Sequence, residues 1–592
     1  MRNYLKLLIA LSLILLYSCQ TNRIDEPAIT IPELEEHIEY LSSDELMGRL
    51  PGTEGDIKSA QYIRDVLQSW GLKPTVDNGL QRFEIVASVE AGENNELIIE
   101  DKPLSHEQFM PFAFSESSEL KAEVVFAGYG FDIHSDTLNW NDYENIDITG
   151  KWVIILRADP EVDSPTSNFA EISADRDKVM MAKDKGAGGV LLVSGKNLDT
   201  RDEFEPLNKG EYSTGIPVFR IKREIANLIL KDKNLSISGL EEELNENYAP
   251  RSFEIDCMIE GTAELIEKKV TTQNILMTLP GIDSTLMNEY IIIGGHFDHL
   301  GMGGPGSSSR AVDTTAIHYG ADDNASGIAA MLEIAEKYAG EGNNARSIIF
   351  AGFAAEEMGL LGSKYLVEHM PVKTDMVNAM INLDMVGRLK ESKTLQVGGI
   401  GTARDLKNIV TSLADTGMLK LTMSEEGYGP SDHSSFYGKD IPVLFFSTGA
   451  HLDYHTPYDT PDKINYEGLV TVSDLVYDIS NELAGKNDKL AFMEAGPKTT
   501  TNRGMRRNGV TLGIMPDFAG NIKNGLRADF VTPGRPADLG GMKKGDIIVA
   551  INGKPINNIQ DYMFRLSKLE HGQTIQVEVL RNDKIELLLI AL

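Results

Sequence analysis

The chain has 592 residues, which is too long for one compact core and indicates about three or four folding units. Hydrophobic residues make up 42% of the chain and charged residues 24%, so a largely disordered protein is not expected. The formal net charge of -33 at pH 7 argues against nucleic acid, or an anionic membrane surface, as the main partner.

The N-terminus is typical of an exported protein. An apolar run at residues 7–17 follows a positively charged start and is too short to span a membrane, as expected for a signal peptide. The run ends in Leu-Tyr-Ser-Cys, which resembles the lipobox of bacterial lipoproteins. This resemblance implies that residues 1–18 are removed, that Cys19 is lipidated, and that the lipid is the protein's only membrane contact. We therefore expect a location in the cell envelope, on the periplasmic face or the cell surface.

Residues 28–82 carry apolar side chains at helical spacing in two segments, 31–46 and 56–70, and predict two helices. From residue 83 the pattern changes to short β-like runs broken by Gly, Asn and Pro. The clearest strands are expected at residues 124–126, 153–156, 190–193 and 216–219, with a helix at 176–185.

The middle region, residues 83–265, contains no cluster of metal-ligand side chains at useful spacing. Its runs GKWVIILR and RDKVMMAKDKGAGGVLLV resemble the protease-associated (PA) domain, a β-rich module inserted in several peptidase families. The resemblance implies that this region shapes access to a neighbouring active site.

Residues 266–488 alternate apolar runs with helical stretches, the pattern of an α/β sheet covered by helices. Four buried strands are predicted at residues 290–293, 347–353, 379–383 and 441–446. Three of them run directly into a candidate metal ligand. In open α/β sheets, ligands gather beyond the carboxyl ends of the strands, so residues far apart in sequence can meet there.

His296 follows the first of these strands in GGHFDHLG, and Asp298 is placed to accept its second N–H and fix the tautomer. His299 is interpreted as a structural histidine. In GADDNASG, Asp322 is expected to bridge two cations, because small residues on both sides of the acids fit a backbone packed tightly round an ion.

Glu356 and Glu357 are adjacent, and adjacent side chains point apart, so one can bind metal while the other acts as general base. Asp384 ends an apolar strand, where an unpaired carboxylate is costly to bury. His455 lies in a polar loop after the last strand. This set of two histidines and three carboxylates suits two zinc ions with open positions for water.

The motifs GGHFDHLG, GADDNASG, AAEE, NLDM and YHTPYDT, in that order, resemble the M28 family of zinc peptidases, which includes leucyl-type aminopeptidases. The resemblance implies a mixed, mostly parallel sheet sandwiched by helices, with the PA module inserted after the N-terminal helices. It assigns one zinc ion to Asp322, Glu357 and His455, and the other to His296, Asp322 and Asp384.

The same resemblance makes Glu356 the general base acting on a metal-bridging hydroxide, gives Tyr428 a hydrogen bond to the oxyanion, and predicts a cis peptide between Asp322 and Asp323. It implies a dizinc aminopeptidase that hydrolyses N-terminal residues from peptide substrates. Alternatives with the same fold are a carboxypeptidase, for which the sequence does not place Arg310 or Arg388 at a substrate carboxylate, and a glutaminyl cyclase. A non-catalytic, receptor-like binding protein is the alternative from another class.

Residues 489–504 are rich in Pro, Thr, Gly and Asn and predict a linker. Within residues 505–592, the runs TLGIMPDF, GLRADFVTPGRPADLGGMKKGDIIVAINGKPI and TIQVEVLR predict a compact β-rich unit. These runs resemble a bacterial PDZ domain, a small β-barrel-like unit, over nearly the whole of residues 510–592. In that family the stretch at residues 512–514 borders a groove that accepts an extended peptide terminus by strand addition. A PDZ fold that serves only as a spacer is the alternative.

Overall fold

The computed structural model describes residues 28–592 except for residues 136–137, 163, 165–166, 171, 208–211, 305–306, 312, 496–509 and 518–523. The predicted signal peptide with Cys19, and half of the predicted linker, lie outside the described residues. None of the helices in the described part of the chain combines the length and apolar character that a membrane span requires.

The largest domain is built on a nine-stranded mixed sheet with the order β1-β13-β15-β14-β16-β19-β17-β18, in which β2 also pairs with β13. Its shorter strands include β1 (Lys73–Pro74), β17 (Thr394–Gly398) and β18 (Lys420–Met423). Four neighbouring strands of this sheet are parallel. They are β14 (Tyr290–His296), β15 (Ser347–Phe353), β16 (Val377–Leu383) and β19 (Val443–Ser447). These are the four strands that the apolar runs predicted, and each is buried along most of its length because helices cover both faces.

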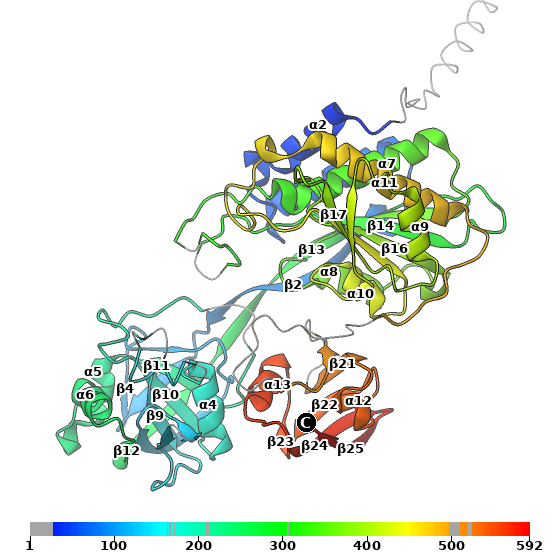
Figure 1. The fold of residues 1–592 in the computed structure, drawn as a ribbon. Helices are drawn as coiled ribbons and strands as arrows, with labels where there is room; N and C mark the ends of the chain where they lie inside the picture. Colours follow the sequence, from blue (N-terminus) through cyan, green and yellow to red (C-terminus); the bar gives the residue numbers. More distant parts are fainter. Residues whose placement is uncertain are drawn as a thin grey trace, which may run out of the picture.

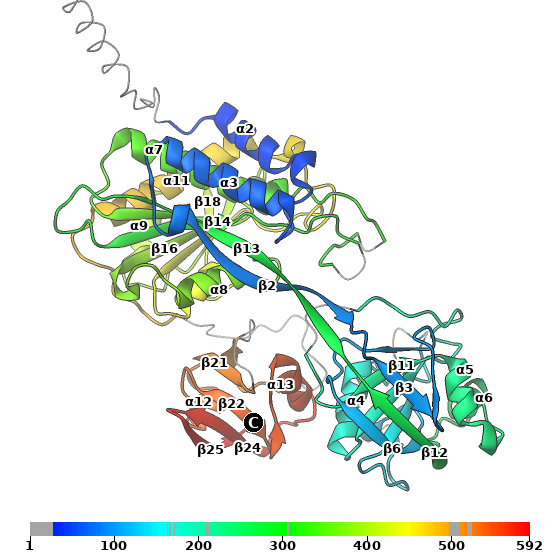
Figure 2. The ribbon, with the colours of Figure 1, turned by 180° about the vertical axis from the view of Figure 1, so that it is seen from behind.

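Two helical layers enclose this sheet (Figures 1 and 2). One face packs against α2 (Ile31–Leu41), α3 (Glu54–Ser69), α7 (Gly327–Glu341), α9 (Leu406–Leu413) and α11 (Tyr466–Gly485), and the other against α8 (Leu361–Glu368) and α10 (His433–Tyr437). Side chains alternate between the layers, since Ile291 and Ile293 belong to the first core and Ile292 to the second. The predicted mixed sheet between helices is confirmed.

The end of the first helix differs from its predicted position. The helix ends at Leu41, and a short 3₁₀ turn at Asp44–Leu46 completes the predicted segment. Helix α7 ends at Glu341, where Gly342, with φ 59°, takes the left-handed conformation.

The middle region forms a separate eight-stranded sheet with the order β4-β3-β12-β6-β9-β10-β11-β5. Its outer strands are β4 (Lys102–Pro103), β3 (Glu96–Ile99) and β5 (Phe109–Pro111). Its central strands are β12 (Ser252–Thr262), β6 (Glu119–Ala127), β9 (Trp152–Leu156), β10 (Gly189–Val193) and β11 (Val218–Ile221), and α4 (Asp175–Asp184) packs beside them. Two long antiparallel strands, β2 (Leu80–Ala91) and β13 (Leu265–Leu279), link this region to the large sheet (Figure 2).

The C-terminal region is β-rich, as predicted. Its sheet has the order β20-β21-β22-β24-β25, with β23 (Lys554–Pro555) paired to β22. The bounds are β20 (Ile514–Pro516), β21 (Leu526–Val531), β22 (Ile547–Ile551), β24 (Thr574–Arg581), β25 (Lys584–Ala591), α12 (Pro536–Leu539) and α13 (Ile559–Leu566). Strand β20 lies at one edge of this sheet.

A fully buried arginine joins the N-terminal helices to the loops that follow β14 and precede α7. Arg49 is 0% exposed and donates hydrogen bonds to the carbonyls of Phe297 (2.6 Å), Tyr319 (2.8 Å), Gly320 (3.0 Å) and Leu41. Burial lowers the pKa of Arg49 to about 10, and nearby carboxylates, Asp298 first, act against that decrease. The guanidinium therefore remains charged at neutral pH and fixes the backbone next to the acidic motifs.

Replacing Arg49 with methionine should lower the free energy of unfolding by at least about 3 kcal/mol, because several buried carbonyl groups lose their donor. Thermal unfolding followed by circular dichroism measures the effect. Lys268→Met, at an exposed ion pair with Glu90, is the matched control and should stay within about 0.5 kcal/mol of the parent. Equal melting temperatures for the two variants would show that Arg49 does not hold these loops.

Candidate metal centre and active site

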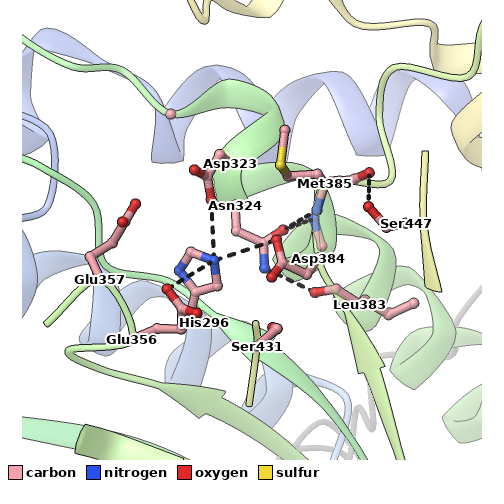
Figure 3. A network of polar contacts seen from close by, with 12 residues as sticks. His296, Asp323, Asn324, Glu356, Glu357, Leu383, Asp384, Met385, Ser431 and Ser447 are labelled. Atoms are coloured by element: carbon pink, nitrogen blue, oxygen red, sulfur yellow. Dashed lines mark hydrogen bonds and ion pairs between the residues drawn. The ribbon is translucent and has the colours of Figure 1, made fainter. Parts of the chain in front are cut away.

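The predicted ligands lie at the carboxyl ends of the parallel strands. His296 is the last residue of β14, Asp384 follows β16, Glu356 and Glu357 follow β15, and His455 lies in the loop after β19. Figure 3 shows Asp323, Glu356, Glu357 and Asp384 around His296. Ala355, Met385 and His455 have positive φ values of 57°, 55° and 57°, so the chain turns sharply at each of these places.

Asp298 and its backbone orient His296. Nδ1 of His296 lies 3.3 Å from the carbonyl oxygen of Asp298 and 3.7 Å from Oδ1 of its carboxylate, and both are acceptors. The proton therefore sits on Nδ1, which leaves the Nε2 lone pair for a cation. That Nε2 atom lies 3.2 Å from Oδ1 of Asp323 and 3.6 Å from Oδ1 of Asp384.

The structure places Asp323, and not Asp322, at the centre of the cluster, which corrects the predicted bridging residue. Oδ1 of Asp323 faces His296, and Oδ2 lies 3.3 Å from Nε2 of His455. The side chain of Asp322 points the other way, where its Oδ1 accepts hydrogen bonds from Gly387 N (2.7 Å) and Ser326 Oγ (3.0 Å). The reason is that neighbouring side chains diverge, and only the path of the backbone decides which one faces the site.

The predicted cis peptide is displaced by the same single residue. The bond between Asp323 and Asn324 is cis, whereas the prediction placed it between Asp322 and Asp323. Asn324 fixes this turn, since its Nδ2 donates to Leu383 O (2.9 Å) and its Oδ1 accepts from Gly327 N (3.1 Å). The small residues of the motif are needed for close packing, because a Cβ on Gly327 would lie 2.4 Å from Leu383 O.

Glu357 lies between two histidines. Its Oε2 is 3.0 Å from Nε2 of His455, and its Oε1 is 2.7 Å from Nδ1 of His299. Nδ1 of His455 faces the carbonyl of Ser308 at 3.1 Å, so its Nε2 lone pair is free to bind a cation. The interpretation of His299 as purely structural is corrected, because this buried imidazole borders the cluster. Its place three residues after His296, in the same strand-end loop, was the available signal.

The sequence motifs did not predict that Asp432 is buried close to this cluster. Asp432, the N-cap of α10, is 0% exposed, and neither of its carboxylate oxygens has a hydrogen bond of good geometry. Burial raises the pKa of Asp432 to about 7, and that of Glu356 well above its usual value, with Glu357, Asp432 and Asp384 adding to the increase for Glu356. The region next to Glu356 therefore holds more buried acidic groups than the sequence motifs predicted, and their mutual repulsion favours the protonated form of Glu356.

The imidazoles compensate for part of this charge. Burial acts to lower the pKa of His455, but Asp323 and Glu357 outweigh it and raise the pKa to about 10. Burial likewise acts to raise the pKa of Asp323, yet His296 and His455 hold it well below its usual value. A divalent cation supplies the same compensation and displaces the imidazole protons when it binds.

The structure does not place the hydroxyl of Tyr428 in contact with the cluster. That hydroxyl donates a hydrogen bond to the carbonyl of Asp529 in the C-terminal domain (3.1 Å), and the ring packs against Tyr437 with centroids 4.7 Å apart. The predicted bond from Tyr428 to an oxyanion therefore stays a prediction.

The donor set fits metal ions. Ligand atoms of His296, Asp323 and Asp384 lie within 4.8 Å of one another, and so do those of His299, Asp323 and Glu357. Asp323 belongs to both groups, and its buried Oδ2 has no hydrogen-bond partner, nor has Nε2 of His455. Imidazole and carboxylate together are typical zinc ligands. Fold and site thus define an α/β protein with a buried metal centre at the carboxyl edge of its sheet.

Comparison with known protein families finds matches to three parts of the chain. Residues 274–480 match the model of peptidase family M28, residues 120–229 that of the PA domain, and residues 512–592 that of the PDZ domain. The chain thus contains a region that matches peptidase family M28, together with a PA domain and a PDZ domain in the predicted order.

The chain is also similar to individual known proteins. The chain is 25% identical over 464 residues to "Aminopeptidase YwaD" of Bacillus subtilis (strain 168), which covers 76% of this chain and 84% of that protein. It is 28% identical to a "Probable leucine aminopeptidase" of Trichophyton verrucosum, over 37% of this chain and 58% of that one. A solved zinc aminopeptidase, BSAP from Bacillus subtilis, has 23% identity, a TM-score of 0.46, and coverage of 79% of this chain and 99% of its own.

The two adjacent aspartates can be told apart by metal content. Asp323→Asn should lose most of the bound zinc, because the Asp323 carboxylate faces both His296 and His455. Asp322→Asn should lower zinc affinity by no more than about 10- to 100-fold, since its carboxylate acts only through the surrounding backbone. Mass-spectrometric metal analysis of the purified, folded variants measures this. Loss of zinc from Asp322→Asn alone would restore the original assignment.

Proposed function

We propose that the protein is a dizinc aminopeptidase that removes N-terminal residues from peptides. The observation that carries the proposal is the position of Asp323, whose two carboxylate oxygens face His296 on one side and His455 on the other. His296, Asp323 and Asp384 would hold one ion, and Asp323, Glu357 and His455 the other, with His299 beside the second. The aminopeptidases among the relatives support this choice of reaction.

Glu356 is the proposed general base. Its Oε2 lies 4.0 Å from Nε2 of His296, and its side chain lines a cavity that also reaches Glu357 and His455. Its backbone N–H donates to Oδ1 of Asp298 (3.0 Å), which ties its position to that of His296. When bound, two zinc ions would lower the pKa of an attacking water and polarise the scissile carbonyl. Glu356 would then take the proton of that water and pass it to the leaving amine.

The contacts around Arg388 do not favour the carboxypeptidase alternative, which needs a free cation for the substrate carboxylate. Arg388 is bonded to Asp453 (3.1 Å) and Asp459 (2.9 Å), and Asp459 in turn accepts hydrogen bonds from the backbone N–H groups of Asp322 and Asp323. Arg388 thus supports the metal-binding loop.

Lipid attachment at Cys19 in the cell envelope remains part of the proposal and rests on the N-terminal sequence alone.

Glu356→Gln tests the base. The variant should keep its zinc, and kcat should fall by about 10²- to 10⁴-fold, because proton transfer is lost while the ligands stay in place. Turnover of a free-amine peptide and metal content are measured on the same sample. Glu391→Gln, the same change at an exposed loop position, is the control. Full activity in Glu356→Gln would reject the role of Glu356.

Substrate direction is tested with matched peptides. A peptide with a free N-terminal amine should lose its residues from that end, and its N-acetylated form should not be cleaved. Mass spectrometry of the products over time shows which end shortens. Removal of residues from the C-terminus of both peptides would replace the aminopeptidase proposal with a carboxypeptidase.

A further inference from the structure

A cavity of about 810 Å³ lies next to the metal centre, and two domains form its walls. Glu356, Glu357 and His455 are among the residues that line it. PDZ residues line the same cavity, among them Met515 and Pro516 of β20. The PDZ domain lies against the face of the large domain that carries α8 and α10 (Figure 1). A substrate that reaches Glu356 through this cavity passes the PDZ domain.

Three contacts hold the PDZ domain at this wall. The Tyr428 hydroxyl donates to the carbonyl of Asp529 (3.1 Å), and the Lys364 ammonium lies 3.6 Å from the Asp517 carboxylate. Lys544 forms an ion pair with Asp440 (2.5 Å). All of these residues except Asp440 line the cavity, so the domain boundary and the cavity wall coincide there.

The PA domain holds the PDZ domain from another side. Arg176 of α4 bonds Asp561 of α13 at 2.8 Å, and both side chains are largely buried. Asp184 of the same PA helix pairs with Arg565 of α13 through both of its carboxylate oxygens. Helix α13 thus contacts the PA domain, and no residue of α13 is among those that line the cavity. The edge strand β20, by contrast, faces it.

The part of the PDZ wall supplied by β20 is apolar. The charged PDZ residues that also line the cavity pair with one another, since Arg527 bonds both Asp517 (2.9 Å) and Asp529 (2.6 Å). Met515 is only half-buried, and Leu360 and Val367 of the large domain line the same cavity. A methionine side chain adapts its shape to an apolar neighbour, so it suits a binding wall.

We propose that the PDZ domain is part of the substrate-binding site: Met515 and Pro516 contact the bound peptide, and the size of the peptide that the active site accepts depends on them. The inference rests on the proposed peptidase function and adds to it a specificity determinant outside the peptidase fold. It differs from capture of a peptide terminus in a separate PDZ groove, because the contacting residues share one cavity with Glu356.

The test uses the full-length zinc-loaded protein with Met515→Trp and Met515→Ala. Substrates are free-amine peptides that increase in length from two to six residues and, at constant length, in the size of the first side chain. Met515→Trp should raise KM for the largest substrates about tenfold and kcat much less, because the added ring fills the cavity without touching Glu356. Met515→Ala should shift the preference in the opposite direction.

Leu587→Trp is the matched control, since Leu587 is 57% exposed on β25 of the same domain and does not line the cavity. Melting temperatures confirm that each variant is folded. Affinity for the same peptides, measured in the Glu356→Gln background, gives a second readout that needs no turnover.

The possible outcomes separate the two proposals. Identical size selectivity in the parent, both Met515 variants and Leu587→Trp would overturn the role of the PDZ wall while leaving the peptidase function intact. A zinc-loaded parent that neither binds nor cleaves any free-amine peptide would overturn the proposed function, and the inference with it. A size-dependent shift in the Met515 variants alone supports the PDZ wall.

Discussion

The structure depends on a dense group of buried carboxylates that must be neutralised. Asp298, Asp323 and Asp432 are almost fully buried, and Glu356, Glu357 and Asp384 are close to it. Like charges at such distances in a medium of low polarity repel strongly. His296, His299 and His455 offset part of this charge, and Arg49 lies behind them. A divalent cation would supply the compensation that the histidines leave incomplete.

The central sheet brings the carboxylates and the histidines together because the ends of its parallel strands lie side by side. Parallel pairing of β14, β15, β16 and β19 places their carboxyl ends at one edge, so residues separated by up to 159 positions, His296 and His455, reach the same point. A second set of polar residues then fixes the loops. Asn324 ties the Asp323 turn to Leu383, and Asp459 with Arg388 ties it to the loop that carries His455.

The three domains are connected in a way that gives the accessory domains a role at the site. The ribbon of β2 and β13 carries the PA domain away from the large sheet, and the PDZ domain occupies the space between them (Figures 1 and 2). Buried charge pairs on the PA side, and a hydrogen bond with two ion pairs on the peptidase side, anchor the PDZ domain. Tyr428 couples the PDZ wall to the loop that contains Asp432.

Local sequence determined the fold class, the four central strands, the order of the three domains, and His296, Glu356, Glu357, Asp384 and His455 as residues of one site. The strands follow from apolar runs, which need no long-range information, whereas the domain order and the grouping of these five residues follow from motifs that resemble known families. Only the tertiary structure decided between Asp322 and Asp323, because adjacent side chains point to opposite sides and the turn at Asn324 sets which one faces inward. Contacts between distant segments also decided the places of His299, Asp432 and Met515, since the neighbours of a side chain depend on packing that no local pattern encodes.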